Sequence, residues 1–186
     1  ILQNLTTAGQ LRATGSGPNW QIQHTLALPT PDAEFRAQID IKTGPSDSTW
    51  RYQITLFYGG SNPWTLTIAH VAAADEFIRF TLEQPVTATT IQRDASVWEV
   101  PFAEWCTVDL WSHPLPGIVT RIPGLPPRTG PSRQGVEVWL NGRQFLLSEV
   151  TATNYGFGGA LAIATNIAGV LIDNAIIWTR QPVMKP

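Results

Sequence analysis

Aromatic and amide side chains stand together at two predicted turns of this 186-residue sequence. Trp64 follows the turn "GGSNP", which contains Asn62, and Tyr155 follows Asn154 in "TNYGFGG". An aromatic ring on a loop can stack against the C–H face of a sugar, while a nearby amide bonds the sugar hydroxyls. We therefore take these four residues as candidate ligand-binding residues. Packing of the turns is the alternative role for the rings.

Two further tryptophans are expected on an exposed sheet face. Trp139 lies in "VEVWL" on the face opposite Val138, and Trp111 shares a face with Thr107 and Asp109. Because successive residues of a strand point to opposite sides, both rings should point away from the main core. They join the candidate ligand-binding residues, and the same face offers an alternative surface for a protein partner.

The segment "GVLIDNAIIW" reads as a strand that is apolar on both faces but holds Asp173 and Asn174 in its middle. A buried carboxylate is costly unless it is paired or hydrogen-bonded. Asp173 could accept hydrogen bonds from a neighbouring segment. Alternatively it could bind a structural Ca²⁺, since carboxylate and amide oxygens suit that ion. A catalytic role is the third alternative, and no other cofactor is expected.

Period-2 alternation predicts the elements that position these residues. "FRAQIDIK", "RYQITLFY", "WTLTIAH", "CTVDL" and "VEVWL" each place apolar side chains on one face and polar ones on the other. This pattern is typical of antiparallel sheets, and we expect about a dozen strands and no helix. Asn141-Gly142 predicts a tight hairpin. Residues 112–135 contain six prolines and four glycines, which predicts a surface loop.

The composition indicates one domain, residues 1–186, with 43% hydrophobic and only 14% charged residues. The net charge of −2 and the scattered basic residues argue against nucleic acid or an anionic membrane as partner. No apolar run reaches the ~18 residues of a membrane span. Cys106 is the single cysteine and is expected in the core. Because the chain starts at Ile1 and its one Met is Met184, we expect a piece of a larger protein, extracellular or in the cell envelope.

Four successive motifs carry a resemblance to a known superfamily. They are "W-x-x-V-x-L" from Trp105, "V-x-V-W-L-N-G", "G-G-x-L-A-I-A-T-N" and "I-D-N-x-x-I-W", which ends at Trp178. Their order resembles the C-terminal half of the concanavalin A-like lectin/glucanase sandwiches, which include laminin-G-like and carbohydrate-binding modules. The resemblance implies an all-β fold, a two-sheet antiparallel β-sandwich of the jelly-roll type.

The resemblance also raises hydrolysis, for which related glycosidases carry acids in E-x-D-x-x-E or E-x-D-x-E spacing along one strand. Among the fourteen acids here, Asp32 and Glu34 are the only pair at i, i+2, and they follow a predicted turn. His24, His70 and His113 lie in separate segments without metal-ligand spacing. We therefore expect no catalytic residues.

These observations favour a non-catalytic extracellular recognition module that binds carbohydrate through loop aromatics. The alternatives are a protein-interaction or adhesion module, a structural ectodomain of a larger cell-surface protein, and a divergent glycoside hydrolase. The expected partner is a glycan or a protein at the cell surface.

Overall fold

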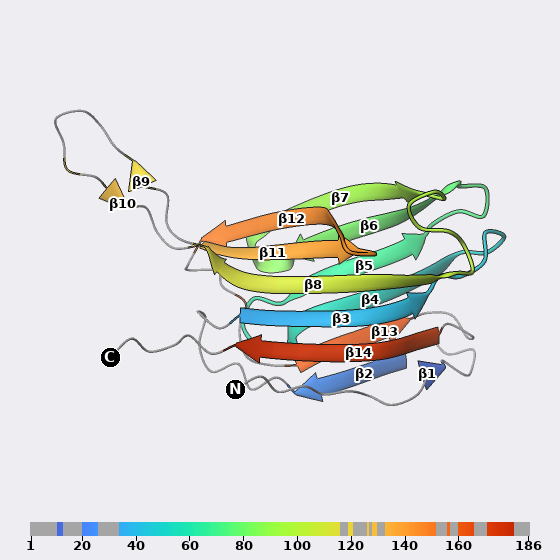
Figure 1. Cartoon of the computed structure of the whole chain (residues 1–186), viewed down its shortest axis with the longest axis horizontal. Helices are drawn as coiled ribbons and strands as arrows, with labels where there is room; N and C mark the ends of the chain where they lie inside the picture. Colours follow the sequence, from blue (N-terminus) through green and yellow to red (C-terminus); the bar gives the residue numbers. More distant parts are fainter. Residues whose placement is uncertain are drawn as a thin grey trace.

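The protein is a sandwich of two antiparallel sheets, as alternation predicted (Figure 1). The computed structural model describes residues 11–12, 20–25, 34–115, 119–120, 126, 128–129, 133–151, 156, 160–165 and 171–180. Strands dominate these residues, and the helical content of the described part is one short 3₁₀ turn, η1 (Pro85–Thr87). The all-β fold class expected from the sequence is confirmed.

Sheet A carries the candidate site. Its strands, in spatial order, are β1 (Leu11–Arg12), β14 (Leu171–Arg180), β3 (Glu34–Lys42), β8 (Trp105–Leu115), β11 (Arg133–Leu140) and β12 (Arg143–Thr151). Every neighbouring pair is antiparallel. Strands far apart in the sequence therefore lie side by side, and β3 sits between β14 and β8.

Sheet B is the second layer. Its strands, in spatial order, are β2 (Trp20–Thr25), β13 (Ala160–Thr165), β4 (Trp50–Tyr58), β5 (Trp64–His70), β6 (Phe77–Gln84) and β7 (Thr89–Ser96). A separate pair, β9 (Val119–Thr120) with β10 (Arg128–Thr129), stands apart from both layers at the left of Figure 1. The crossovers between the two layers make the sandwich a jelly roll.

The core lies between the layers and follows the alternation of each strand. Phe35, Ala37, Ile39 and Ile41 of β3 are fully buried, while their neighbours on the same strand reach solvent. The equivalent alternation on β4, β5 and β6 supplies the facing side chains. Burial of this apolar surface is the main stabilising contribution to the fold.

Two turn predictions have different outcomes. The predicted hairpin at Asn141-Gly142 is confirmed, since both residues adopt the positive φ of a two-residue turn between β11 and β12. The prediction of a loop at 112–135 extends too far at both ends. Strand β8 continues to Leu115, and strand β11 begins at Arg133. Pro114 is tolerated in β8 because the ladder between β8 and β3 ends at Ser112, so no donor is needed on that side.

Cys106 points inward from β8 and is 1% exposed. Burial raises the pKa of its thiol to about 12. We expect no reaction of native protein with a thiol reagent at pH 8, and complete reaction after unfolding in guanidinium. Because the unfolded thiol ionises near pH ~8.5, stability should fall as the pH rises from there towards 12. Rapid labelling of the native protein would contradict the burial of Cys106.

Candidate functional site

The outer surface of sheet A gathers aromatic and charged side chains from its three central strands, β3, β8 and β11. We call this surface the sheet A face. Its members are Glu34, Arg36, Asp109, Trp111, His113, Glu137 and Trp139. The register brings them together: Arg36, Trp111 and Glu137 lie in one row across the three strands, and Asp109 is opposite Trp139 in the next row.

Glu137 is the centre of a hydrogen-bond network. Its Oε1 lies 2.8 Å from Nε2 of His113, and its Oε2 accepts from Nε1 of Trp139 at 2.7 Å and from Nε2 of Gln144 at 3.0 Å. Glu137 is only 9% exposed, so it needs these partners to offset its desolvation. The network therefore fixes the orientation of the Trp139 ring.

Arg36 and Asp109 form an ion pair beside Trp139. Arg36 Nε lies 2.9 Å from both Asp109 oxygens, and Arg36 Nη2 also donates to Oδ2. The hydrogen bonds to Asp109 raise the pKa of the Arg36 guanidinium, so its charge is permanent. Arg36 is half-exposed whereas the Asp109 side chain is 10% exposed, so the pair presents its cationic end to solvent.

Trp111 is held on two sides. Its indole Nε1 donates to Glu34 Oε1 at 2.9 Å, and its ring lies against the His113 ring with centroids 4.4 Å apart. Both indole N–H groups of the sheet A face are thus bound by carboxylates, and both tryptophans are half-buried. Rings fixed in this way lose little conformational entropy when a ligand stacks on them.

The candidate residues predicted from the sequence have separate outcomes. Trp111 and Trp139 point away from the core, as alternation predicted. Trp64 was expected on a loop, but it is the first residue of β5 and is fully buried in the core, so no sugar can stack on it. The prediction for Trp64 is wrong because this residue already belongs to β5, and the alternation of that strand places its side chain on the buried face.

The turn residues are only partly described. Asn62 is half-exposed with φ +46°, and its backbone oxygen accepts from Nε2 of the buried Gln84 at 3.2 Å. Asn154 and Tyr155 lie outside the described residues. Their neighbour Gly156 is buried, and a Cβ there would lie 2.8 Å from the Asn62 backbone oxygen. Gly156 therefore lies against the turn that contains Asn62.

Asp173 and Asn174 lie at an irregularity in the pairing of β14 with β3, within sheet A. The register shifts between Asp173 and Ile176, and Asn174 has φ +46°. Asn174 Nδ2 donates to Asp40 Oδ2 at 2.9 Å, and its backbone N–H donates to Asp173 Oδ1 at 2.8 Å. Asn174 thus donates one hydrogen bond to Asp173 and one to Asp40, the acid opposite Asp173 in the neighbouring strand. In the described part of the chain, groups of three or more His, Cys, Asp or Glu that could hold a metal are absent, and calcium at Asp173 stays a prediction.

The sequence did not single out Glu34, Arg36, Asp109, His113 and Glu137 as one site. These residues come from three strands, so their spacing along the chain could not show that they lie together. Alternation did place Asp109 on the same face as Trp111, and Glu137 on the same face as Trp139, but only within each strand. Asp109 and Glu137 lie at diagonal positions of neighbouring strands. Both oxygens of each carboxylate already accept hydrogen bonds, and this arrangement does not provide a free acid and base for hydrolysis.

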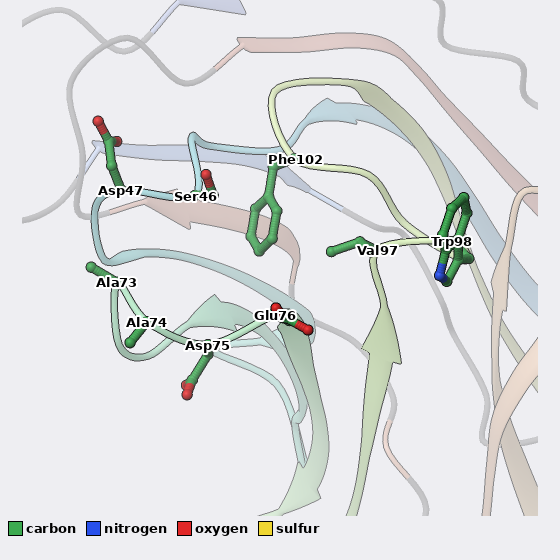
Figure 2. Close-up of a pocket in the computed structure, with 9 residues that line it drawn as sticks. All are labelled: Ser46, Asp47, Ala73, Ala74, Asp75, Glu76, Val97, Trp98 and Phe102. Atoms are coloured by element: carbon green, nitrogen blue, oxygen red, sulfur yellow. The ribbon is translucent and has the colours of Figure 1, made fainter.

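A hollow of about 560 Å³ lies among the loops beyond the ends of β3, β5 and β7. It is lined by Ser46, Asp47, Ala73, Ala74, Asp75, Glu76, Val97, Trp98 and Phe102. Figure 2 shows Asp47 and Asp75 turned away from each other and Trp98 at the edge. Trp98 is 93% exposed. The polar groups do not converge on one point, so this hollow is a weaker candidate than the sheet A face.

No protein-family model matches the sequence, and no curated protein sequence matches it. The CBM2 module of the evolved Dit of Lactobacillus casei BL23 phage J-1 has a similar structure, with TM-score 0.55 and 7% identity over 85% of this chain and 68% of that one. The binding domain of botulinum neurotoxin serotype D gives TM-score 0.50 and 12% identity over 95% of this chain and 42% of that one. The chain therefore spans less than half of the neurotoxin domain.

A legume lectin-like domain from Entamoeba histolytica gives TM-score 0.48 and 9% identity over 96% of this chain and 86% of that one. At such identities the likeness concerns the fold alone. The likeness to the CBM2 module is one of fold, and it agrees with the two-sheet antiparallel sandwich that the sequence resemblance implied. The described residues include no helix that is long and apolar enough to span a membrane.

Proposed function

We propose that the protein is a non-catalytic carbohydrate-binding module whose ligand lies on the sheet A face. The observation that carries the proposal is the pair of half-buried tryptophans, Trp111 and Trp139, each fixed by a carboxylate that accepts its indole N–H. Fixed rings provide stacking surfaces for sugar C–H faces, and the surrounding charged groups provide directional partners for hydroxyls. An extracellular or cell-envelope setting follows from this proposal.

The spacing of the two rings favours an oligosaccharide. Trp111 lies opposite Glu137, and Trp139 lies opposite Asp109, so the two rings occupy diagonal positions of β8 and β11. Diagonal positions are roughly 7–8 Å apart, which is wider than one hydrogen-bonded pair of residues. A chain of sugars can contact both rings, whereas a single sugar ring contacts mainly one. We therefore expect affinity to rise from monosaccharides to trisaccharides.

The fold similarity to the CBM2 module of the phage Dit supports a carbohydrate ligand. The proposal moves the binding surface from the loops, where the sequence placed it, to the face of the sheet. It keeps Trp111 and Trp139 as ligand-binding residues and removes Trp64. Asn62 lies in the turn before β5, whereas Asn154 and Tyr155 lie outside the described residues, and the proposed contacts need none of the three.

A glycan array followed by isothermal titration calorimetry on the best ligand tests the proposal. We expect Trp111→Ala and Trp139→Ala each to weaken binding at least tenfold, because each removes one stacking surface. Each variant also removes a hydrogen bond to a carboxylate and should lower the melting temperature, so binding is compared at a temperature where circular dichroism shows every variant folded.

Trp98→Ala provides the matched control, because Trp98 is 93% exposed at the other candidate hollow. Its affinity should equal that of the unaltered protein. Loss of binding in Trp98→Ala with normal binding in the two sheet A variants would move the site to the hollow. A silent array would exclude the carbohydrate proposal and favour a protein partner.

A further inference from the structure

The charges of the sheet A face carry information about the class of glycan. Arg36 is bonded to Asp109, and these two charges balance one another. Among the described residues, the donors to Glu137 are instead the indole of Trp139, the amide of Gln144 and the imidazole of His113. The carboxylate at the centre of the site is therefore not paired with an Arg or Lys side chain of the described residues.

A second negative charge lies further along β3. Asp40 accepts from Thr107 Oγ1 at 2.6 Å and from Asn174 Nδ2 at 2.9 Å, and both donors are neutral. Asp173 lies directly across from Asp40 in the neighbouring strand. Lys42 lies beyond Asp40 on the same face of β3, but the described carboxylates outnumber the cations on both sides of the Arg36–Asp109 pair, so the field above them is negative.

Burial makes this field effective at short range. The side chains of Asp109 and Glu137 are 10% and 12% exposed, so solvent screens them less than it screens free surface charges. A carboxylate, sulfate or phosphate on a ligand would meet like charge here, since Arg36, the cation at the middle of the described face, is already bonded to Asp109. Sugar hydroxyls meet no such penalty, because they can donate to the carboxylate oxygens.

We propose that the sheet A face selects neutral glycans and discriminates against glycans that carry carboxylate, sulfate or phosphate groups. This inference rests on the proposed carbohydrate function and names its ligand class. The selection comes from the electrostatic field of Glu137 and Asp40, whereas affinity comes from stacking on Trp111 and Trp139.

The test begins with an array that presents neutral glycans beside their acidic counterparts, such as lactose beside sialyllactose and galactose oligomers beside galacturonate oligomers, at pH 8 and low salt. We expect the bound glycans to be neutral and each acidic counterpart to bind at least tenfold more weakly. The difference should shrink to less than threefold in 0.5 M salt, because the Debye length falls to a few ångströms (roughly 4 Å).

Two lysine variants separate charge from shape. Gln38 lies on the sheet A face between Arg36 and Asp40, opposite Asp109 of β8. Gln38→Lys should reduce the discrimination against acidic glycans at least threefold at low salt. The matched control is Gln53→Lys, which adds the same charge to the outer face of sheet B, opposite Thr67, and should leave the discrimination unchanged.

The outcomes are distinguishable. Tighter binding of an acidic glycan than of its neutral counterpart overturns the selection but leaves the carbohydrate function intact. A discrimination that persists unchanged in high salt and in Gln38→Lys also overturns it, because the cause would then be steric. A wholly silent array overturns the proposed function, and the selection with it.

Discussion

Replacing Trp64 with alanine should lower the free energy of unfolding by about 3–5 kcal/mol, the usual cost of removing a buried large aromatic side chain. Trp64 is fully buried within the core cluster between the sheets. The substitution removes a large apolar surface and leaves a cavity that the surrounding strands can fill only partly. Denaturant unfolding followed by circular dichroism measures the change.

Two controls sharpen this prediction. Trp98→Ala removes the same side chain from a position that is 93% exposed and should change stability by less than about 0.5 kcal/mol. Trp64→Phe should cost clearly less than Trp64→Ala, because the Trp64 indole nitrogen is buried without a hydrogen-bond partner among the described residues. Equal stability of Trp64→Ala and the unaltered protein would contradict the buried position.

Replacing Gln134 with leucine should lower the free energy of unfolding by about 2–4 kcal/mol. Gln134 of β11 is 2% exposed, and its amide binds both backbone groups of Gly156: Nε2 donates to the carbonyl at 2.9 Å and Oε1 accepts from the N–H at 2.8 Å. Leucine fills a similar volume but leaves two buried backbone groups unpaired. Chemical denaturation again provides the measurement.

Gln92→Leu on the exposed surface of β7 is the matched control and should leave stability within about 0.5 kcal/mol. A neutral effect of Gln134→Leu would show that the contact with Gly156 contributes nothing to stability.

Gln134→Leu also distinguishes a ligand site on the sheet A face from a ligand site near Gly156. If the ligand lies on the sheet A face, folded Gln134→Leu protein should bind glycan normally, whereas a site built on the loop around Gly156 should be lost.

The position of Gly156 explains why this contact is specific. A Cβ at residue 156 would lie 2.4 Å from Cδ2 of Phe57, so only glycine fits between that ring and the β4–β5 turn. The sequence shows a glycine-rich stretch at 154–159, but it does not show which glycine is enclosed. The close approach of Phe57 and the β4–β5 turn to residue 156 decides that glycine is needed there. The Gln134 side chain then binds both backbone groups of that glycine.

The sequence by itself determined the layers and which way most strand residues point. Period-2 alternation on β3, β8 and β11 is a local property of the backbone, so it correctly placed Phe35 inside and Trp111 and Trp139 outside. The Asn141-Gly142 turn was equally predictable, because its positive φ values depend on two adjacent residues. The predicted fold class follows from these same local signals.

Only the tertiary structure decided which outward residues form a site. The row Arg36, Trp111 and Glu137 joins three strands whose order and register depend on the packing of the whole sandwich. Trp64 was misplaced for a related reason: the sequence shows that it follows a turn, but burial depends on where the opposite sheet lies. Alternation fixes the side of a strand on which a residue lies, whereas neighbours across strands are fixed by hydrogen-bond register and packing between segments distant in sequence.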